Sequence, residues 1–186
     1  MKLNYKRTIF VGFAFFLICT FWQAYDTIIP KILVDQFGMS QAGSGVVMAL
    51  DNILALFLLP FFGSLSDRSH SKIGKRMPFI LFGTGCAVIL MNILPLLDNS
   101  YAAQPSGLKT ASFVIVLGLL LVAMGTYRAP AVALMPDVTP KPLRSRANAI
   151  INLMGAVGGI LYLGVAAVLY PNSKTAGVEH VNYQPL

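Results

Sequence analysis

The chain has 186 residues, of which 56% are hydrophobic and only 11% are charged. Soluble domains are roughly 45–50% apolar and about 25% charged, so this composition excludes an ordinary water-soluble fold and indicates a membrane protein. The formal net charge of +7 does not indicate a nucleic-acid partner, because the lysines and arginines stand in short segments between apolar runs. Cys19 and Cys86 lie inside apolar runs without metal-ligand spacing, so we expect no metal site and no cofactor.

The apolar runs predict an all-α membrane protein with five spanning helices. Each run is long enough, at about 1.5 Å of rise per residue, to cross most of a roughly 30 Å hydrocarbon layer. We expect the helices to cover about residues 8–30, 44–62, 78–97, 111–135 and 147–170. Pro78 suits the start of the third helix, because the first turn leaves its N–H position unpaired in any case. Residues 98–110, rich in Asn, Ser and Pro, are predicted to form a polar loop.

The positions of the charged residues predict the orientation of these helices. Three segments on one side of the predicted membrane hold ten of the fourteen lysines and arginines, namely Lys2, Lys6, Arg7, Arg68, Lys72, Lys75, Arg76, Lys141, Arg144 and Arg146. The opposite side holds only Lys31, Lys109 and Lys174. By the positive-inside rule the N-terminus is predicted to lie in the cytoplasm. We expect the protein to be integral to the plasma membrane.

The connection between the second and third helices carries a recognisable motif. Residues 63–79 contain Gly-x-x-Ser-Asp-Arg, a five-residue spacer, and Gly-Lys-Arg-x-Pro-Phe. This resembles the corresponding loop of major facilitator superfamily transporters, most closely the sucrose/proton symporters and the related glycoside-pentoside-hexuronide cation symporters. Residues 25–30 (YDTIIP) and 48–52 (MALDN) are similar to the first two helices of the same branch. Since each half of such a transporter has six helices, the resemblance implies that residues 1–186 are a partial N-terminal half, truncated before the sixth helix.

The resemblance also implies a gating role for two charged turns. Each turn presents an acid and several bases within about ten residues, so we expect salt bridges that form and break as two halves of a carrier rock. Charge that serves topology alone is the alternative, although it would require neither Asp67 nor Gly74. The predicted gating residues are Gly63, Asp67, Arg68, Gly74, Lys75, Arg76, Asp137, Arg144 and Arg146.

Arg128 stands inside the fourth apolar run. A charge in this position costs about 2.5–3.5 kcal/mol on insertion scales, so it is expected to face a partner or a watered cavity. The alternative is an arginine that snorkels to the surface, but about 12 Å of helix separates Arg128 from that surface. Its planar fork of donors suits sugar hydroxyls or a carboxylate, which makes Arg128 a candidate substrate-binding residue. In plant sucrose carriers the corresponding arginine lies about one turn nearer the position of Asp137.

Further candidate substrate-binding residues stand in the first two helices. Trp22, Gln23 and Tyr25 combine a flat apolar face with hydrogen-bonding groups, the mixture that sugar sites use, and Asn52 adds an amide. Aromatic residues also mark any membrane interface, which is the alternative interpretation.

Asp51 and Asp26 are the candidate proton-coupling acids. A carboxylate in a low-dielectric cavity, with an arginine near it, has a tunable affinity for a proton. Asp51 is expected to lie at nearly the same depth in the membrane as Arg128. The alternative for Asp26 is a purely structural role at the frayed outer end of its helix.

The fifth predicted helix is rich in glycine. Gly155 and Gly159 have the small-x-x-x-small spacing that allows close helix packing. No proline lies within residues 147–170, which disfavours a drug/proton antiporter, since those carriers usually have a proline-containing signature here.

No nucleophile–base pair, phosphate-binding glycine loop or zinc motif is present, so we do not expect an enzyme. The family resemblance implies a transporter, and we expect proton-coupled uptake of a sugar or glycoside by alternating access, in a lipid membrane, with the missing C-terminal half required for transport. One alternative is a carrier of the same fold for another solute or ion, including a sodium-coupled carrier or an exporter. Another is a five-span fragment or partner subunit that does not itself transport.

Overall fold

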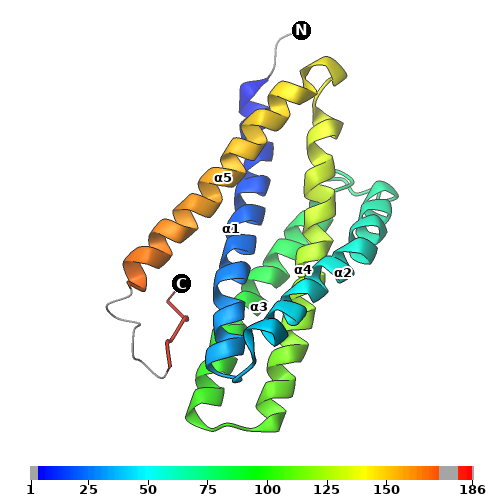
Figure 1. Cartoon of the computed structure of the whole chain (residues 1–186). Coiled ribbons are helices and arrows are strands. Elements are labelled where there is room, and N and C mark those ends of the chain that lie inside the picture. The colour runs from blue at the N-terminus through cyan, green and yellow to red at the C-terminus, as the bar shows by residue number, and fades with distance from the viewer. Residues whose placement is uncertain (1–3, 172–179, 186) are drawn as a thin grey trace.

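The computed structural model describes residues 4–171 and 180–185. Within these residues the chain is all-helical, and five helices are long and apolar enough to cross a membrane, which confirms the predicted fold class. The helices are α1 (Tyr5–Asp35), α2 (Gln41–Asp67), α3 (Met77–Ala103), α4 (Gly107–Val138) and α5 (Arg144–Leu169), with a short 3-10 helix η1 (Lys141–Leu143) before α5. They form one elongated bundle in which the start of α1 and the α4–α5 turn lie at one end, and the α1–α2 and α3–α4 turns lie at the other (Figure 1).

Most of the helices extend beyond their predicted ends. The predicted polar loop over residues 98–110 is largely helical, because α3 continues through Ala103 and α4 begins at Gly107. Helix α4 also continues past Pro136, so Asp137 lies in its last turn instead of in a connecting turn. Prolines inside membrane helices are tolerated because neighbouring groups satisfy the freed backbone carbonyls. Polar residues at these positions mark where a helix leaves the apolar layer, and not where the helix stops.

Small residues set the closest helix contacts. Helix α5 packs against α1, α3 packs against α4, and α2 packs mainly against α4. A Cβ atom added at Gly158 would lie 2.5 Å from the carbonyl oxygen of Phe16, and one at Gly155 would lie 2.8 Å from Cys19 Sγ. At Gly159 the corresponding distance, to Gln23 Oε1, is an ordinary 3.7 Å. Close packing of α5 therefore depends on Gly155 and Gly158, whereas Gly159 of the predicted pair leaves room for a methyl group.

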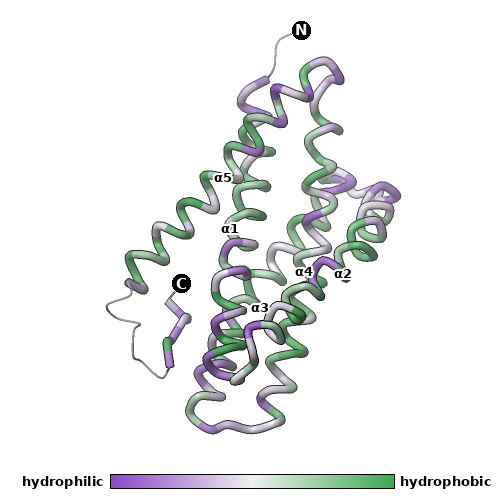
Figure 2. The backbone as a smooth tube through the Cα atoms, in the orientation of Figure 1, coloured by the Kyte–Doolittle hydropathy of each residue, from purple (hydrophilic) through white to green (hydrophobic). Residues whose placement is uncertain are grey.

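The outer surface of the bundle is apolar along its length. Hydrophilic residues gather at the turns and helix ends, while hydrophobic residues dominate the helix bodies (Figure 2). Large exposed hydrophobic side chains occur on every helix, for example Phe10, Phe57, Phe82, Ile115 and Ile160. A surface of this kind is stable in a lipid bilayer, where every backbone polar group is already satisfied within a helix.

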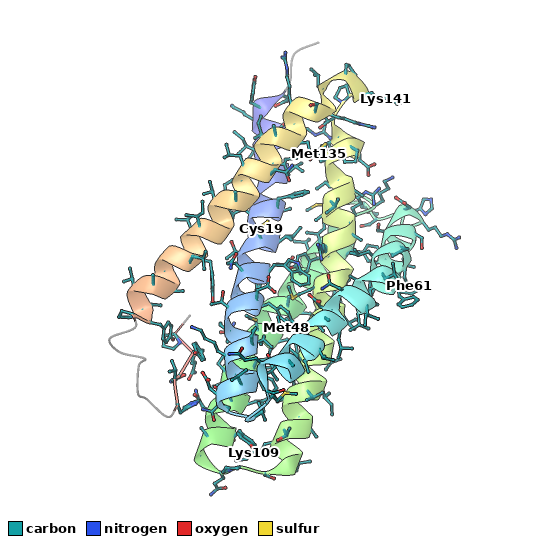
Figure 3. The ribbon with its side chains drawn as sticks, viewed as in Figure 1. Cys19, Met48, Phe61, Lys109, Met135 and Lys141 are labelled. Carbon is teal, nitrogen blue, oxygen red and sulfur yellow. The ribbon has the colours of Figure 1, made fainter. Side chains whose placement is uncertain are left out.

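The two ends of the bundle differ in charge. Lys141 lies at the end that carries most of the lysines and arginines, and Lys109 lies at the opposite end (Figure 3). Lys2 and Lys174, both used in the prediction of orientation, lie outside the described residues.

Candidate substrate site and charged cluster

A polar cluster lies within the apolar span of α1, α2 and α4. The Cζ atom of Arg128 stands 4.7 Å from the centre of the Trp22 ring, a cation–π contact between α4 and α1. Both residues, together with the buried Asp51 of α2, line a cavity of about 10 Å³. That volume holds roughly one water molecule. Three of the predicted site residues, from three different helices, therefore meet at one place.

Close approach of α2 and α4 positions this cluster. Gly125 stands one turn before Arg128, and a Cβ atom added to it would lie 3.2 Å from Leu58 Cβ. The absence of a side chain at Gly125 thus lets α2 lie directly on α4 beside the arginine. The remaining lining of the cavity is mostly aliphatic, so charges within it are weakly screened.

Arg128 and Asp51 share this cavity without forming an ion pair. Among the described residues, the recorded ion pairs lie elsewhere, and Arg128 contacts the Trp22 ring. Asp51 Oδ1 accepts a hydrogen bond of 2.8 Å from the side-chain amide of its neighbour Asn52. The guanidinium donors of Arg128 and one carboxylate oxygen of Asp51 are therefore available to a third group.

The other predicted residues of the first helix lie around this cluster in different ways. Tyr25 is fully buried, with its ring edge-on to Trp22 at 5.6 Å. Gln23 turns towards α5, with its Oε1 near Gly159. Asp26 is exposed, one helical turn beyond Trp22. The cluster thus consists of Trp22, Arg128 and Asp51 with Asn52, and Gln23 lies outside it.

A second cluster joins three helices at the basic end of the bundle. Arg76, which precedes α3, is only 6% exposed and binds the last turns of α2 and α4. Its Nη2 lies 2.8 Å from Asp67 Oδ1, and its Nε donates to Asp137 Oδ2 at 2.5 Å. Its Nη1 donates to Ser66 Oγ at 3.1 Å. One buried guanidinium therefore satisfies two carboxylates and a hydroxyl from helices that are distant in sequence.

Lys75 and Gly74 complete this Arg76 cluster. Lys75 Nζ lies 3.7 Å from Asp67 Oδ1 and 3.5 Å from Asp137 Oδ2, in a more exposed position. Gly74 has φ of +105°, a backbone conformation that side-chain-bearing residues rarely adopt. The glycine lets the chain turn sharply so that the next two residues face both carboxylates.

The remaining predicted gating residues do not join the Arg76 cluster. Arg144 binds the end of α4 through backbone oxygens, since its Nη2 donates to Pro136 O at 2.8 Å and its Nε donates to Thr139 O at 3.3 Å. Arg68 and Arg146 are exposed. A Cβ atom added at Gly63 would have no described atom within 4 Å, apart from its own helix backbone and its chain neighbours. The structure therefore shows no packing reason for this glycine.

Sequence reasoning missed two features. Ser66 shares the Arg76 guanidinium, but a serine in a polar turn gives no distinct signal. Asp98 is fully buried at the other end of α3, although it was expected in a loop. The clue to its burial was the long apolar run that leads directly into it.

The fold and the buried charges define a polytopic helical membrane protein with a polar site inside the membrane. Its family is shown by comparison with known proteins. The chain belongs to the Major Facilitator Superfamily, whose family model matches residues 11–176.

Similar curated proteins are sucrose transport proteins and symporters. The chain is 35% identical to sucrose transport protein SUC3 of Arabidopsis thaliana over 146 residues, which cover 72% of the chain and 25% of that protein. It is 32% identical to the uncharacterized symporter YnaJ of Bacillus subtilis over 168 residues, which cover 86% of the chain and 35% of YnaJ. It is 26% identical to the alpha-ketoglutarate permease of Escherichia coli over 158 residues, or 85% of the chain and 33% of that permease.

The chain thus spans about a quarter to a third of the length of these relatives. No solved structure matches the chain. Membership in this transporter family confirms the prediction that the chain is not an enzyme.

Proposed function

We propose that the protein containing this chain takes up a sugar or glycoside by secondary active transport. The names of the plant relatives support a sugar as the solute, and the symporter among the bacterial relatives supports coupling to an ion. Because the chain covers only part of each relative, the transport cycle belongs to the whole protein, which we propose includes a second half.

The observation that carries this proposal is the meeting of Trp22, Arg128 and Asp51 inside the membrane. A sugar ring has an apolar face that packs on an aromatic ring, and hydroxyls that accept from a guanidinium and donate to a carboxylate. The indole N–H of Trp22 is buried and has no hydrogen-bond partner among the described residues, so it is a further available donor. These groups provide both kinds of contact that a sugar needs.

The present cavity is much too small for a sugar. At about 10 Å³ it accommodates a single water molecule, so α2 and α4 have to separate, or a second half has to widen the site, before a sugar can enter. This requirement fits alternating access, in which bundles of helices rock around a central site. Asp51, which lines the same cavity, is our first choice for the proton-coupling acid, and the exposed Asp26 is the second.

We further propose that the Arg76 cluster is a gate on the cytoplasmic side of the plasma membrane. The excess of lysine and arginine at this end supports a cytoplasmic location, by the positive-inside rule. The ion pairs of Arg76 hold the ends of α2, α3 and α4 together. Lys75, which is more exposed and contacts both carboxylates from a longer distance, is available to exchange partners as the helices move.

The experiment is uptake of labelled sucrose by cells that express the whole protein with Arg128→Ala or Arg128→Lys. We expect Arg128→Ala to abolish uptake, because no other cation lines the cavity within the described residues. Arg128→Lys keeps the charge but loses the planar fork, and it is expected to retain only part of the activity. Surface labelling confirms that each variant is inserted. Normal uptake by an inserted Arg128→Ala protein would contradict the assignment.

The coupling ion is tested separately from the solute. Proton coupling predicts that a protonophore stops accumulation and that removal of sodium has no effect. The opposite pattern would identify a sodium-coupled carrier of the same fold.

A dicarboxylate is the second candidate solute. An arginine without a carboxylate partner in an apolar cavity suits an anionic substrate, and the alpha-ketoglutarate permease is among the relatives. Unlabelled 2-oxoglutarate, which is alpha-ketoglutarate, is added during uptake of labelled sucrose to distinguish the two solutes. Inhibition of sucrose uptake would indicate that the dicarboxylate binds to the site.

A further inference from the structure

Asp98 is a buried carboxylate that the proposed transport site does not use. It lies near the end of α3, far along the helix from the Arg76 cluster, and none of its surface is exposed. Neither of its carboxylate oxygens has a hydrogen-bond partner among the described residues. An ionised carboxylate without a partner is strongly unfavourable in such a position, so this site favours a bound proton or a cationic neighbour.

Within the described residues, the basic group that lies beside Asp98 comes from the segment that follows α5. His180 Nδ1 lies 3.9 Å from Asp98 Oδ2. The opposite ring nitrogen, Nε2, donates to the side-chain oxygen of Asn99 at 2.7 Å, and the amide nitrogen of Gln36 contacts Nδ1. The imidazole of His180 thus touches the ends of both α1 and α3.

Other contacts place residues 180–185 against the same end of the bundle. The side-chain amide of Asn99 donates to Asn182 Oδ1 at 2.8 Å. The Tyr170 hydroxyl donates to Asn182 O at 2.8 Å, and the Tyr170 and Tyr183 rings lie 5.4 Å apart. The segment is therefore held by polar contacts of His180 and Asn182 and by burial of the Tyr183 ring in the apolar core.

Several other charged or titratable groups surround this site. A cavity of about 20 Å³, enough for one water molecule, is lined by Lys31 and Asp35 of α1 as well as by Asp98, His180 and Tyr183. Lys109 of α4 donates to the carbonyl oxygen of Ser100 at 2.7 Å. Burial raises the pKa of Tyr183 to about 12 and also raises the pKa of Tyr170, so neither phenol ionises near neutral pH. Glu179 lies outside the described residues.

We propose that Asp98 and His180 form a proton-binding site that holds residues 180–185 against the ends of α1 and α3. A proton on the Asp98 carboxyl lets the two side chains stay buried together, because a neutral acid needs no charged partner in this position. Loss of this proton leaves a buried carboxylate without a cationic partner, and hydration of the carboxylate then requires the segment to move away. The segment is docked when the site holds its proton and released when the proton is lost.

Amide hydrogen exchange of the purified full chain in lipid nanodiscs tests this proposal. Exchange of peptides that contain residues 180–185 is followed between about pH 5.5 and pH 9, with correction for the intrinsic pH dependence of exchange. In the wild-type chain we expect protection to fall roughly tenfold or more across this range as the segment is released. Protection that does not change with pH would overturn the proposal.

Substitutions at the pair give opposite expected results. Asp98→Asn mimics a carboxyl group that has kept its proton, so the segment should stay protected at every pH. His180→Ala removes the central contact, so protection should be low at every pH. A pH dependence in either variant that equals the wild-type dependence would show that the pair is not the proton site.

Two substitutions serve as matched controls. His70→Gln removes the chain's other histidine, which is exposed near the Arg76 cluster, and Glu179→Gln removes the acid next to His180 in sequence. Both variants should keep the wild-type pH dependence. Loss of that dependence in Glu179→Gln would assign the effect to Glu179 and overturn the role of Asp98.

Discussion

Removal of the Arg76 side chain should destabilise the bundle strongly at its basic end. Arg76→Ala deletes the guanidinium contacts to Asp67, Asp137 and Ser66, and the arginine side chain is only 7% exposed. A hydrogen bond to a charged group contributes about 1.5–3 kcal/mol. The side chains of Asp67 and Asp137 are 55% and 32% exposed, so water replaces part of what they lose. We therefore expect a decrease of about 2–4 kcal/mol in the free energy of unfolding, below the sum of three such bonds.

The assay is reversible unfolding of the full chain in mixed micelles, with helix content measured as the denaturing detergent is increased. Arg68→Ala is the matched control, because Arg68 is an exposed arginine at the same end and should change stability by less than about 0.5 kcal/mol. Arg76→Lys keeps the positive charge but loses the planar guanidinium, so its free energy of unfolding should lie between those of Arg76→Ala and Arg68→Ala. The reasoning is refuted if Arg76→Ala is as stable as Arg68→Ala.

Two further predictions concern helix packing and the substrate site. Gly158→Ala places a methyl group against the backbone of Phe16, which cannot move aside as a flexible side chain would, and should lower the free energy of unfolding by about 1–3 kcal/mol in the same assay. Gly164→Ala is the control, because its methyl group meets open space and should not lower stability. Equal stabilities of the two variants would contradict this reasoning. Trp22→Ala removes the ring beneath Arg128 and should reduce sucrose uptake by the whole protein far more than Trp22→Phe, which keeps a weaker cation–π partner. Equal uptake by both Trp22 variants would show that the ring does not position the arginine.

Much of the fold could be predicted from the sequence because lipid imposes strict requirements. A helix that crosses the membrane needs a long apolar run, and such runs are visible without knowledge of any tertiary contact. The ends of the helices were less predictable. Asp98 and Asp137 look like loop residues, but at a membrane surface a helix continues through polar residues until its backbone has other partners.

The sequence indicated candidate residues for the site, but it did not indicate how they are arranged. A cation at Arg128 inside an apolar run is conspicuous, and the need for a polar environment follows from physics alone. The structure adds that this environment includes the Trp22 ring and that Asp51 lies in the same cavity without an ion pair to Arg128. These details depend on how three helices are rotated about their axes, which the sequence does not reveal. In the same way, the cations of the basic turn were evident, but only the structure shows that Arg76 is the buried one.

The most direct test of the central claim is sugar counterflow in proteoliposomes that contain the whole protein. Vesicles loaded with unlabelled sucrose are diluted into labelled sucrose without any ion gradient, so that passage of the sugar is measured apart from coupling. We predict that vesicles loaded with sucrose transiently accumulate labelled sucrose and that this accumulation disappears in Arg128→Ala. Vesicles loaded with 2-oxoglutarate instead of sucrose should not accumulate labelled sucrose. The account would be contradicted if labelled sucrose still accumulates in Arg128→Ala, or if it accumulates only in vesicles loaded with 2-oxoglutarate. Either result would argue against a sugar site formed by Trp22, Arg128 and Asp51.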